Sequence, residues 1–426
     1  MSASRPRTVF TGLGLITPLG ATPEAFWQAL LAGQSGIKPI SLFDASGLPA
    51  RIAGEISDFD AKKVFDKKDR KSLKMMARAI QLGVSASLLA LKDADVDTNR
   101  IDPTRVGIDF GAALIASELE EMAAAAELSV PEPKEKVDLH TWGAKGMTTM
   151  PPLWMLKYLP NMPACHISIL ANLQGPSNTV TEDDVAPLLA MAEAQRILQR
   201  GQADVMLTGG TDSRINILSL SRLTMFSEFS QRNDEPTKAC RPFDAQRDGK
   251  VLGEGAGILV LEELEHAQRR GAKIYGELLG CGASFDRQRD GSGLARAITA
   301  ALSQAGVGPD QIDHVNAQGF STRADDVMEA RGIAAAFAGK PPPVWAVKAS
   351  TGSMGAAGGS TELAASLLAL QHGQIPGTLN CDHPDPECPI SVPTGAPRPR
   401  TRDCALKVSF TPMGQCAAAV VRRWTS

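Results

Sequence analysis

Residues 240–257 read CRPFDAQRDGKVLGEGAG, a polar loop that leads into an apolar segment at 257–261. The four glycines in this stretch allow positive φ angles and close approach of neighbouring backbones, because glycine has no Cβ atom. Charged side chains, including Arg247, Asp248 and Glu254, stand among the glycines, and we expect them to tie the loop together. The stretch therefore predicts a tightly folded loop at the start of a buried strand.

The whole chain has 426 residues, more than one simple hydrophobic core accommodates, which predicts two domains or one duplicated domain. Hydrophobic residues make up 43% of the chain and charged residues 21%, which is typical of a soluble globular protein. Aromatic residues are only 5%, a balance that favours helices packed closely on sheets over a β-sandwich.

Strand-like and helix-like segments alternate along the chain, which indicates an α/β fold. Both halves open with a strand that runs into a glycine-containing turn, so the sequence predicts an internal duplication with halves 1–262 and 263–426. A polar break is expected at 131–136. The expected strands are 8–13, 106–110, 166–169, 205–208, 257–261, 274–279, 314–316, 404–410 and 417–421, and the expected helices are 72–91, 118–127, 186–199, 294–305 and 361–371.

Charge, cysteine and hydropathy patterns exclude several classes of function. The net charge of −3 means that basic residues are not in excess, whereas nucleic-acid binding would need such an excess. Seven cysteines without a C-x-x-C pair predict reduced thiols in a cytoplasmic protein and no metal site. No apolar stretch approaches ~20 residues, so no membrane span is expected. Gly12 and Gly14 lack the G-x-G-x-x-G spacing of a dinucleotide site, and no cofactor is predicted.

The densest basic cluster lies at 62–74 and contains Lys62, Lys63, Lys67, Lys68, Arg70, Lys71 and Lys74. Such a cluster is read either as a solvated surface or as a docking surface for an acidic carrier protein.

Several motifs together resemble the β-ketoacyl-acyl-carrier-protein (ACP) synthases. RPFD-x-x-RDG-x-V-x-GEGAG at 241–257 is similar to that family's signature almost letter for letter. Further matches keep the family's order and nearly its spacing: VFTGLGLITPLG at 9–20, TGGTD at 208–212, SQRNDEP at 230–236, VNA at 315–317 and GAAG at 355–358. The resemblance covers essentially the whole chain.

This resemblance implies a thiolase fold, in which two similar α/β halves form five layers, αβαβα, and two chains form a two-fold dimer. It also implies a site in which a cysteine takes the acyl group as a thioester. Two histidines then assist decarboxylation of a malonyl unit and stabilise the enolate and the oxyanion.

The residues at those positions differ in this chain. In GPSNTVTEDD at 175–184 the nucleophile position falls on Asp184, and in VNAQGFST at 315–322 the first histidine position falls on Gln318. In KASTGSMG at 348–355, which is one residue shorter than the family's segment, the second histidine position falls on Ser353, while the family's lysine is retained as Lys348. The sequence therefore predicts that no catalytic triad is intact.

Chemistry supports that expectation. The pKa of a carboxylic acid lies ~4 to 5 units below that of the thiol that it would displace from a thioester. This difference adds about 6 kcal/mol to the barrier for attack by a carboxylate. Gln318 can donate a hydrogen bond but cannot take up a proton. We expect Asp183 or Asp184 to be the N-cap of the helix at 186–199, since Pro187 is tolerated only in a first turn. The alternative is a general base that activates water.

The C-terminal end of the site also differs. The family has Gly-Phe-Gly-Gly after the segment that matches Ser409 and Phe410, where this chain has Thr411, Pro412, Met413 and Gly414. Phe410, Pro412 and Met413 are predicted to occupy the gate and pocket positions, with Pro412 stiffening the gate. His314, which stands alone in a strand, is expected to be structural. Residues 154–162 are read either as ordinary core or as the dimer interface and tunnel wall that the resemblance implies.

The sequence thus predicts a non-catalytic subunit similar to a chain-length factor, which pairs as a heterodimer with a catalytic β-ketoacyl synthase or as a homodimer with itself, with ACP as a further partner. Two alternatives stay open: a thioester hydrolase or decarboxylase that uses Asp183 or Asp184, and a homodimer that binds acyl-ACP without reacting.

Overall fold

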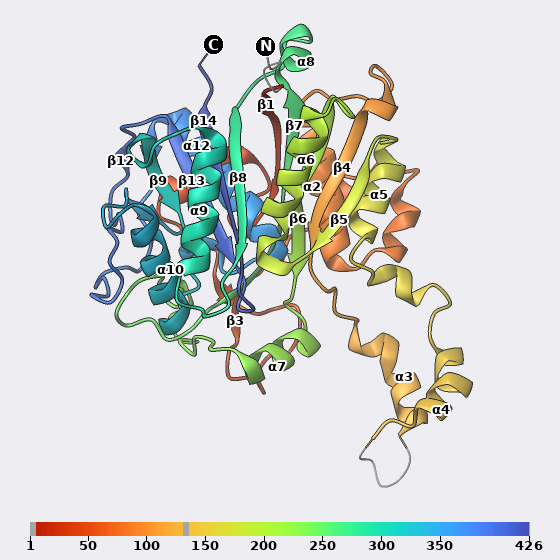
Figure 1. Cartoon of the computed structure of the whole chain (residues 1–426). Coiled ribbons are helices and arrows are strands. Elements are labelled where there is room, and N and C mark those ends of the chain that lie inside the picture. Colours follow the sequence, from red (N-terminus) through yellow and green to blue (C-terminus); the bar gives the residue numbers. More distant parts are fainter. Residues whose placement is uncertain (1–5, 131–135, 426) are drawn as a thin grey trace.

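The computed structural model describes residues 6–130 and 136–425, and strands and helices alternate along it as predicted (Figure 1). The strands are β1 (Thr8–Ile16), β2 (Lys38–Pro39), β3 (Ile52–Gly54), β4 (Val106–Ala112), β5 (Ser177–Thr181), β6 (Val205–Ser213), β7 (Leu252–Glu263), β8 (Gly276–Phe285), β9 (Ile312–Asn316), β10 (Val344–Trp345), β11 (Gln374–Ile375), β12 (Arg398–Pro399), β13 (Cys404–Phe410) and β14 (Gln415–Arg423). The α-helices are α1 (Pro23–Leu31), α2 (Arg78–Asp93), α3 (Leu119–Ser129), α4 (Leu139–Ala144), α5 (Met162–Ala171), α6 (Ala186–Gln199), α7 (Ile217–Phe226), α8 (Leu264–Arg269), α9 (Ser292–Ala305), α10 (Arg323–Ala336), α11 (Lys348–Thr351) and α12 (Gly358–His372).

The main sheet repeats one strand pattern twice. Its order is β10-β9-β13-β14-β8-β1-β7-β6-β4-β5. In the first half β1, β7 and β6 are antiparallel neighbours, whereas β6, β4 and β5 are parallel. In the second half β8, β14 and β13 are antiparallel, whereas β13, β9 and β10 are parallel. The two five-strand units meet where β1 pairs antiparallel with β8.

Helices cover these units in layers. α6 packs on β4 and β6 of the first unit. α12 packs on β7 of the first unit and on β13 of the second. The two helices also contact each other, so they lie between the units. α2 packs on β1, β6 and β7 of the first unit, and α9 packs on β8 and β14 of the second. Residues Gly358 to Leu370 of α12 are all buried, as a helix in a central layer must be.

The same close contact between strand and helix occurs once in each half. A Cβ atom on Gly14 of β1 would lie 1.9 Å from the carbonyl oxygen of Ala86 in α2. A Cβ atom on Gly282 of β8 would lie 2.0 Å from the carbonyl oxygen of Ala297 in α9. Because the repeated strand pattern and this repeated contact coincide, we propose that the chain is a duplication whose halves join between β7 and β8, near the predicted boundary at 262 and 263.

One predicted strand is wrong. Residues 166–169 lie inside helix α5, which has Pro163 in its first turn and ends at Asn172 in the left-handed conformation, with φ 52°. A short apolar run fits a buried helix as well as a strand, and here packing against α2 decides for the helix. The polar break expected at 131–136 falls mostly outside the described residues.

All seven cysteines are unpaired thiols, and five of them are buried. Across residues 6–130 and 136–425, no helix combines the length and the apolar character needed to cross a membrane.

Candidate active site

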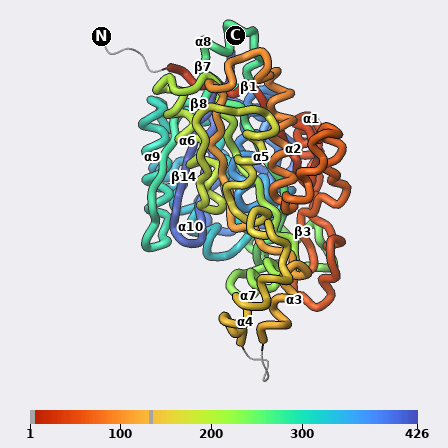
Figure 2. Tube along the Cα trace, turned by 90° about the vertical axis from the view of Figure 1, so that its right-hand side faces the viewer, coloured from red at the N-terminus to blue at the C-terminus, as the bar shows by residue number. Residues whose placement is uncertain are grey.

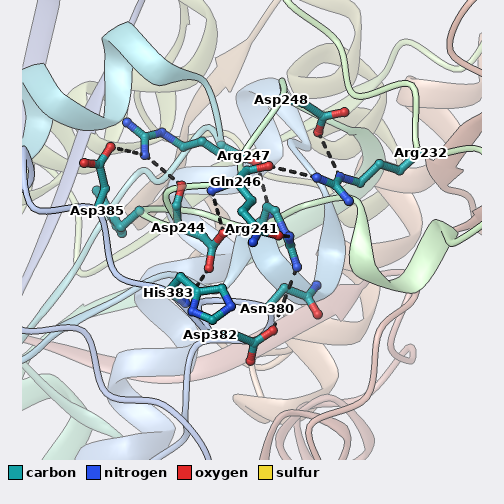
Figure 3. Close-up of polar contacts among 12 residues, drawn as sticks. Arg232, Arg241, Asp244, Gln246, Arg247, Asp248, Asn380, Asp382, His383 and Asp385 are labelled. Carbon is teal, nitrogen blue, oxygen red and sulfur yellow. Dashed lines mark hydrogen bonds and ion pairs between the residues drawn. The ribbon is translucent and has the colours of Figure 1, made fainter.

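The loop at 240–250 is held by buried charge, as the sequence predicts (Figure 3). The Arg247 side chain is 1% exposed and lies 2.6 Å from the carboxylate of Asp385. It also donates to the carbonyl oxygens of Asp244 at 2.8 Å and Thr322 at 2.9 Å. The Asp244 carboxylate accepts a hydrogen bond from the backbone of His383 at 2.7 Å. These contacts fix the loop against the segments that follow β9 and β11.

Glu254 anchors the strand that leaves this loop. Its carboxylate is fully buried and pairs with Arg78 of α2 at 2.6 Å. It also accepts hydrogen bonds from the backbone of Ile56 and the hydroxyl of Ser213. The expectation that charged residues tie this region together is confirmed.

Asp184 lies in the 3-10 turn Asp183–Val185, directly before α6, and is 5% exposed. Its Oδ1 atom accepts a hydrogen bond from Nε2 of Gln318 at 3.0 Å. Burial raises the pKa of the Asp184 carboxyl, while the positive charges of Lys348 and Lys250 act to lower it. The structure thus brings two of the predicted site residues, Asp184 and Gln318, into direct contact across the two halves.

The predicted N-cap role of these aspartates is wrong. Neither the turn Asp183–Val185 nor α6 has a side-chain capping hydrogen bond. Asp183 adopts φ 55°, a conformation that aspartate tolerates better than most residues, and its carboxylate pairs with Arg214. Arg214 also lies 2.8 Å from Asp212. The carboxylates of Asp183 and Asp184 therefore bind the side chains of Arg214 and Gln318, respectively, instead of backbone N–H groups.

Gln318 is held by its backbone. Its N–H donates to Oε1 of Glu329 at 2.6 Å, and the N–H of Gly319 donates to Oε2 of the same carboxylate at 2.8 Å. Burial raises the pKa of Glu329 to about 7, against these two backbone hydrogen bonds. Among the described residues, Oε1 of Gln318 is buried without a hydrogen-bond partner, as is the hydroxyl of Ser409.

A buried cluster of two lysines and one carboxylate lies behind these residues. Lys348 and Lys407 both contact the Glu362 carboxylate, Lys407 at 2.5 Å, and all three side chains are at most 1% exposed. Lys407 also donates to the carbonyl oxygen of Ala317 at 3.0 Å. Burial lowers the pKa of Lys407 to about 8.

Ser353 is not part of this contact network. Its backbone N–H donates to Val251 and its carbonyl oxygen accepts from Gly253, both at 2.8 Å, which fixes it beside the start of β7. No side-chain hydrogen bond joins it to Asp184 or Gln318 in the part of the chain that the structure describes.

A cavity of about 340 Å³ opens beside Asp183. Pro412 and Met413 line it, whereas Phe410 is buried and packs edge-on against Phe320, with 5.2 Å between ring centroids. The remaining lining residues are Ala113, Leu114, Thr181, Glu182, Asp183, Arg214, Ser219, Arg222, Thr411 and Gln415.

His314 is structural, as expected. It is fully buried, and its ring nitrogens lie 3.0 Å from Asp313 and 3.1 Å from the hydroxyl of Ser366.

The sequence analysis missed four charged residues of this region: Arg214, Lys250, Glu329 and Lys407. Lys407 had a detectable signal, because it is the one charge in the otherwise apolar strand CALKVSF. Lys250 occupies the variable position of the RDG-x-V motif. The sequence shows that this position carries a positive charge, but it does not show which way the side chain points.

Comparison with known proteins gives consistent matches over the whole chain. Residues 6–267 match the family described as Beta-ketoacyl synthase, N-terminal domain, and residues 275–382 match Beta-ketoacyl synthase, C-terminal domain. The chain is 37% identical to 3-oxoacyl-acyl-carrier-protein synthase 2 of Synechocystis sp. over 95% of both chains. It is 36% identical to the protein of that name from Vibrio cholerae, over 99% of this chain and 100% of the relative.

Solved structures with the same architecture include the ishigamide ketosynthase/chain length factor, with a TM-score of 0.87 and 29% identity over 99% of this chain and 100% of that chain. A second is a type II polyketide-synthase acyl carrier protein in complex with its ketosynthase. It has a TM-score of 0.85 and 25% identity, over 99% of this chain and 100% of that chain.

These relatives overturn the predicted function. The sequence predicts a non-catalytic partner subunit similar to a chain-length factor, with a hydrolase or decarboxylase and a non-reacting homodimer as alternatives. Relatives with 34 to 37% identity over nearly the whole chain are instead named as 3-oxoacyl-acyl-carrier-protein synthases. The prediction equated loss of three side chains with loss of the reaction. The site nevertheless retains a buried carboxylate, an amide donor and lysines.

Proposed function

Because the chain belongs to the β-ketoacyl synthase family and has its thiolase fold, we propose that it is a condensing enzyme of the 3-oxoacyl-ACP-synthase type, which joins an acyl group to a malonyl-derived unit. The observation that carries the proposal is the buried Asp184 carboxylate, which is hydrogen-bonded to Gln318 and whose sequence neighbour Asp183 lines the cavity. We assign the family's nucleophile position to Asp184 and its imidazole positions to Gln318 and Ser353, with Lys348 as the retained lysine.

In the first step, the Asp184 carboxylate attacks the carbonyl carbon of an acyl-ACP thioester. The C–S bond breaks, the carrier leaves as a thiolate that takes up a proton from solvent, and the acyl group stays on Asp184 as a mixed anhydride. The mismatch in basicity between carboxylate and thiolate opposes this step by about 6 kcal/mol. Because burial raises the pKa of Asp184, the carboxylate is more basic than an exposed one and the mismatch is smaller.

In the second step, a malonyl thioester loses CO₂, and the electron pair of the broken C–C bond forms an enolate. The enolate carbon attacks the acyl carbonyl of the anhydride, the bond to Asp184 breaks, and the 3-oxoacyl thioester leaves the free carboxylate behind. Nε2 of Gln318 is the donor that lies nearest Asp184, and a donor of this kind stabilises developing negative charge. Two lysines that share Glu362 supply further positive charge behind the site.

The carrier would reach this site through the cavity beside Asp183. Pro412 and Met413, on the turn between β13 and β14, would form its gate together with Phe410. The lysines at 62–74 would dock the acidic carrier. They support this role because Lys62, Lys63, Lys67 and Lys68 are exposed and have no carboxylate within 4 Å among the described residues.

A second copy of the chain would cover the face around α3 to α5. α3 and α4 project from the body in both views (Figure 1, Figure 2). β5, the edge strand of the sheet, has one side without a neighbouring strand in the described chain. Unpaired strand edges and large apolar patches are features of subunit interfaces. Exposed apolar side chains on this face are Leu114, Leu119, Leu128, Leu139, Met147, Leu153, Met155, Leu156 and Ile169.

The proposal is tested with the purified protein, acyl-ACP and malonyl-ACP labelled in the free carboxyl group. Wild type should release labelled CO₂ and form a 3-oxoacyl thioester. When the protein is incubated with acyl-ACP alone and then separated from it, hydroxylamine should release the bound acyl group as a hydroxamate; the separation is needed because hydroxylamine also cleaves thioesters. Asp184→Asn should lower both signals by at least ~100-fold, because it removes the nucleophile. Running the assay with acyl-pantetheine measures what carrier docking contributes, and docking predicts a higher KM without the carrier.

Asp109→Asn is the matched control. Asp109 is also a buried carboxylate, but it lies within β4, outside the proposed reaction centre. Its activity should stay close to wild type. The proposal is wrong if wild type releases no CO₂ and no hydroxamate, or if Asp184→Asn is as active as wild type.

A further inference from the structure

The turn that carries Asp184 has an unusual backbone conformation. Asp183, the residue directly before Asp184, has φ 55°, which lies in the left-handed region. Aspartate tolerates this region better than most residues, but only glycine adopts it without cost. Two backbone hydrogen bonds close the turn: the N–H of Val185 donates to the carbonyl oxygen of Glu182 at 3.3 Å, and the N–H of Ala186 donates to that of Asp183. Since the turn has no side-chain cap, a contact from outside it is needed to offset the cost of this conformation.

Arg214 supplies that contact. Its guanidinium group pairs with the Asp183 carboxylate, and its Nε atom donates to Oδ2 of Asp212 at 2.8 Å. Asp212 is 3% exposed, and its Oδ2 atom also accepts a hydrogen bond from the N–H of Ala356 at 3.2 Å. Asp212 is thus fixed by β6 and by the turn directly before α12. It holds Arg214 in place, and Arg214 in turn holds Asp183.

The surroundings leave Arg214 little freedom to move. A Cβ atom on Gly355 would lie 2.0 Å from Oδ2 of Asp212 and 3.0 Å from Nη2 of Arg214. The Arg214 side chain is 19% exposed, whereas that of Asp183 is 42% exposed. An ion pair between two mobile surface side chains contributes little, because both must be ordered to form it. Here the cation is already ordered by Asp212, so the pair with Asp183 loses less side-chain entropy on forming.

We infer that Arg214 is a positioning residue that holds Asp183 in the left-handed conformation and thereby directs the Asp184 carboxylate towards Gln318. The φ angle of residue 183 sets the course of the chain into residue 184, whose Oδ1 atom lies 3.0 Å from Nε2 of Gln318. Relaxation of this angle to a negative value would move Asp184 away from its donor. The consequence for acyl transfer rests on the function proposed above, whereas the role of Arg214 in the turn does not.

Glycine at position 183 provides the test, because glycine adopts a positive φ angle without a partner. A double-mutant cycle combines Arg214→Met with Asp183→Gly. Hydrogen exchange measured by mass spectrometry follows the amides of Val185 and Ala186, whose hydrogen bonds close the turn. Arg214→Met should speed their exchange by at least ~10-fold when residue 183 is aspartate, and by less than ~2-fold when it is glycine.

The same cycle is measured on hydroxamate formation from acyl-ACP. Arg214→Met should lower the rate by at least ~10-fold when residue 183 is aspartate, because the carboxylate of Asp184 is displaced. The loss should shrink to less than ~3-fold when residue 183 is glycine. If Arg214 served only to hold Asp212 or to line the cavity, the loss would be the same in both backgrounds.

Arg105→Met is the matched control. Arg105 also pairs with an aspartate, Asp204, at 2.7 Å, and its side chain is 35% exposed. It lies directly before β4, whereas the turn with Asp184 follows β5 at the other end of this parallel pair of strands. Arg105→Met should therefore change neither the exchange of the turn nor hydroxamate formation.

Thermal melting establishes that each variant is folded. If Arg214→Met does not fold, Asp183→Asn takes its place, since it removes the ion pair and keeps a residue that tolerates a positive φ angle. Unchanged exchange in the folded variant, or equal effects of Arg214→Met in both backgrounds, would overturn the inference, whether or not the protein condenses thioesters. An exchange cycle that behaves as expected, in a protein that forms no hydroxamate and releases no CO₂, leaves the role of Arg214 standing and rejects the proposed function.

Discussion

At the scale of single residues, the site consists of groups whose charge depends on burial. Asp184, Glu329 and Lys407 are buried, and burial shifts each pKa towards the neutral form. Hydrogen bonds and nearby charges act against these shifts. The balance between burial and these contacts decides which groups carry charge at neutral pH.

Asp109 shows the same effect with little compensation, since only Asn178 acts to lower its pKa. It is fully buried in β4, and neither carboxylate oxygen has a hydrogen-bond partner within the described residues. Burial, together with the negative charge of Glu193, raises the pKa of Asp109 to about 7.

This shift predicts a stability effect. An unfolded aspartate titrates near pH ~4, so between about pH 4 and 7 the folded state binds more protons than the unfolded chain, and stability falls as the pH rises. Asp109→Asn should remove this part of the slope and stabilise the protein at pH 8 by on the order of 1 kcal/mol relative to wild type. Urea unfolding at pH 5 and pH 8 measures it. Equal pH dependence in the two proteins would contradict the assignment.

At the scale of elements, close contacts between strand and helix determine how each half packs. β1 lies so close to α2, and β8 to α9, that only glycine fits at the contact points. Strand-facing glycines are therefore packing residues here, which explains why the early glycines do not form a nucleotide-binding turn.

Gly14→Ala should consequently destabilise the protein by about 3 kcal/mol or more, because the added methyl group would lie 1.9 Å from a carbonyl oxygen and force α2 away from the sheet. Urea unfolding gives the free energy. The control is Gly143→Ala in α4, where a Cβ atom meets nothing within 4 Å. Alanine favours a helix over glycine, so this change should be neutral or stabilising by up to roughly 1 kcal/mol. A Gly14→Ala protein as stable as wild type would show that α2 can yield at no cost.

At the scale of the whole molecule, the site lies where the halves meet. Asp184 comes from the first half, whereas Gln318, Lys348, Glu362 and Lys407 come from the second. The central helices α6 and α12 contact each other and bring these segments together. Neither half contains the site on its own.

The exposed apolar face around α5 predicts the assembly. Wild type should have about twice the mass of its 45.0 kDa chain in light scattering coupled to size-exclusion chromatography. Ile169→Asp, on a side chain that is 76% exposed, should shift the protein to the monomer mass, because a charge at a dry interface is costly.

Phe285→Asp is the control, since Phe285 is also apolar and 53% exposed but lies at the end of β8, in the second half of the chain. It should stay dimeric. A monomeric wild type, or a dimeric Ile169→Asp, would reject a second copy as the occupant of this face.

The sequence by itself determined most of the fold. Local signals such as Pro187 at a helix start and the apolar runs of β4 and β13 predict their elements, because they depend on neighbouring residues only. The motifs also singled out Asp184 and Gln318, whose side chains the structure brings into contact. Sequence reasoning failed at 166–169, where a short apolar run fits either a strand or a helix.

Tertiary structure alone decided the partners of those residues. Asp184 meets Gln318 across 134 positions of sequence, and Glu362 meets both Lys348 and Lys407. The sequence shows the charge and spacing of these residues but not where their side chains point. It therefore predicted that Asp183 or Asp184 caps a helix, whereas both carboxylates bind side chains instead. Which charges offset one another depends on distance in space and on burial, and both arise only when the two halves pack together.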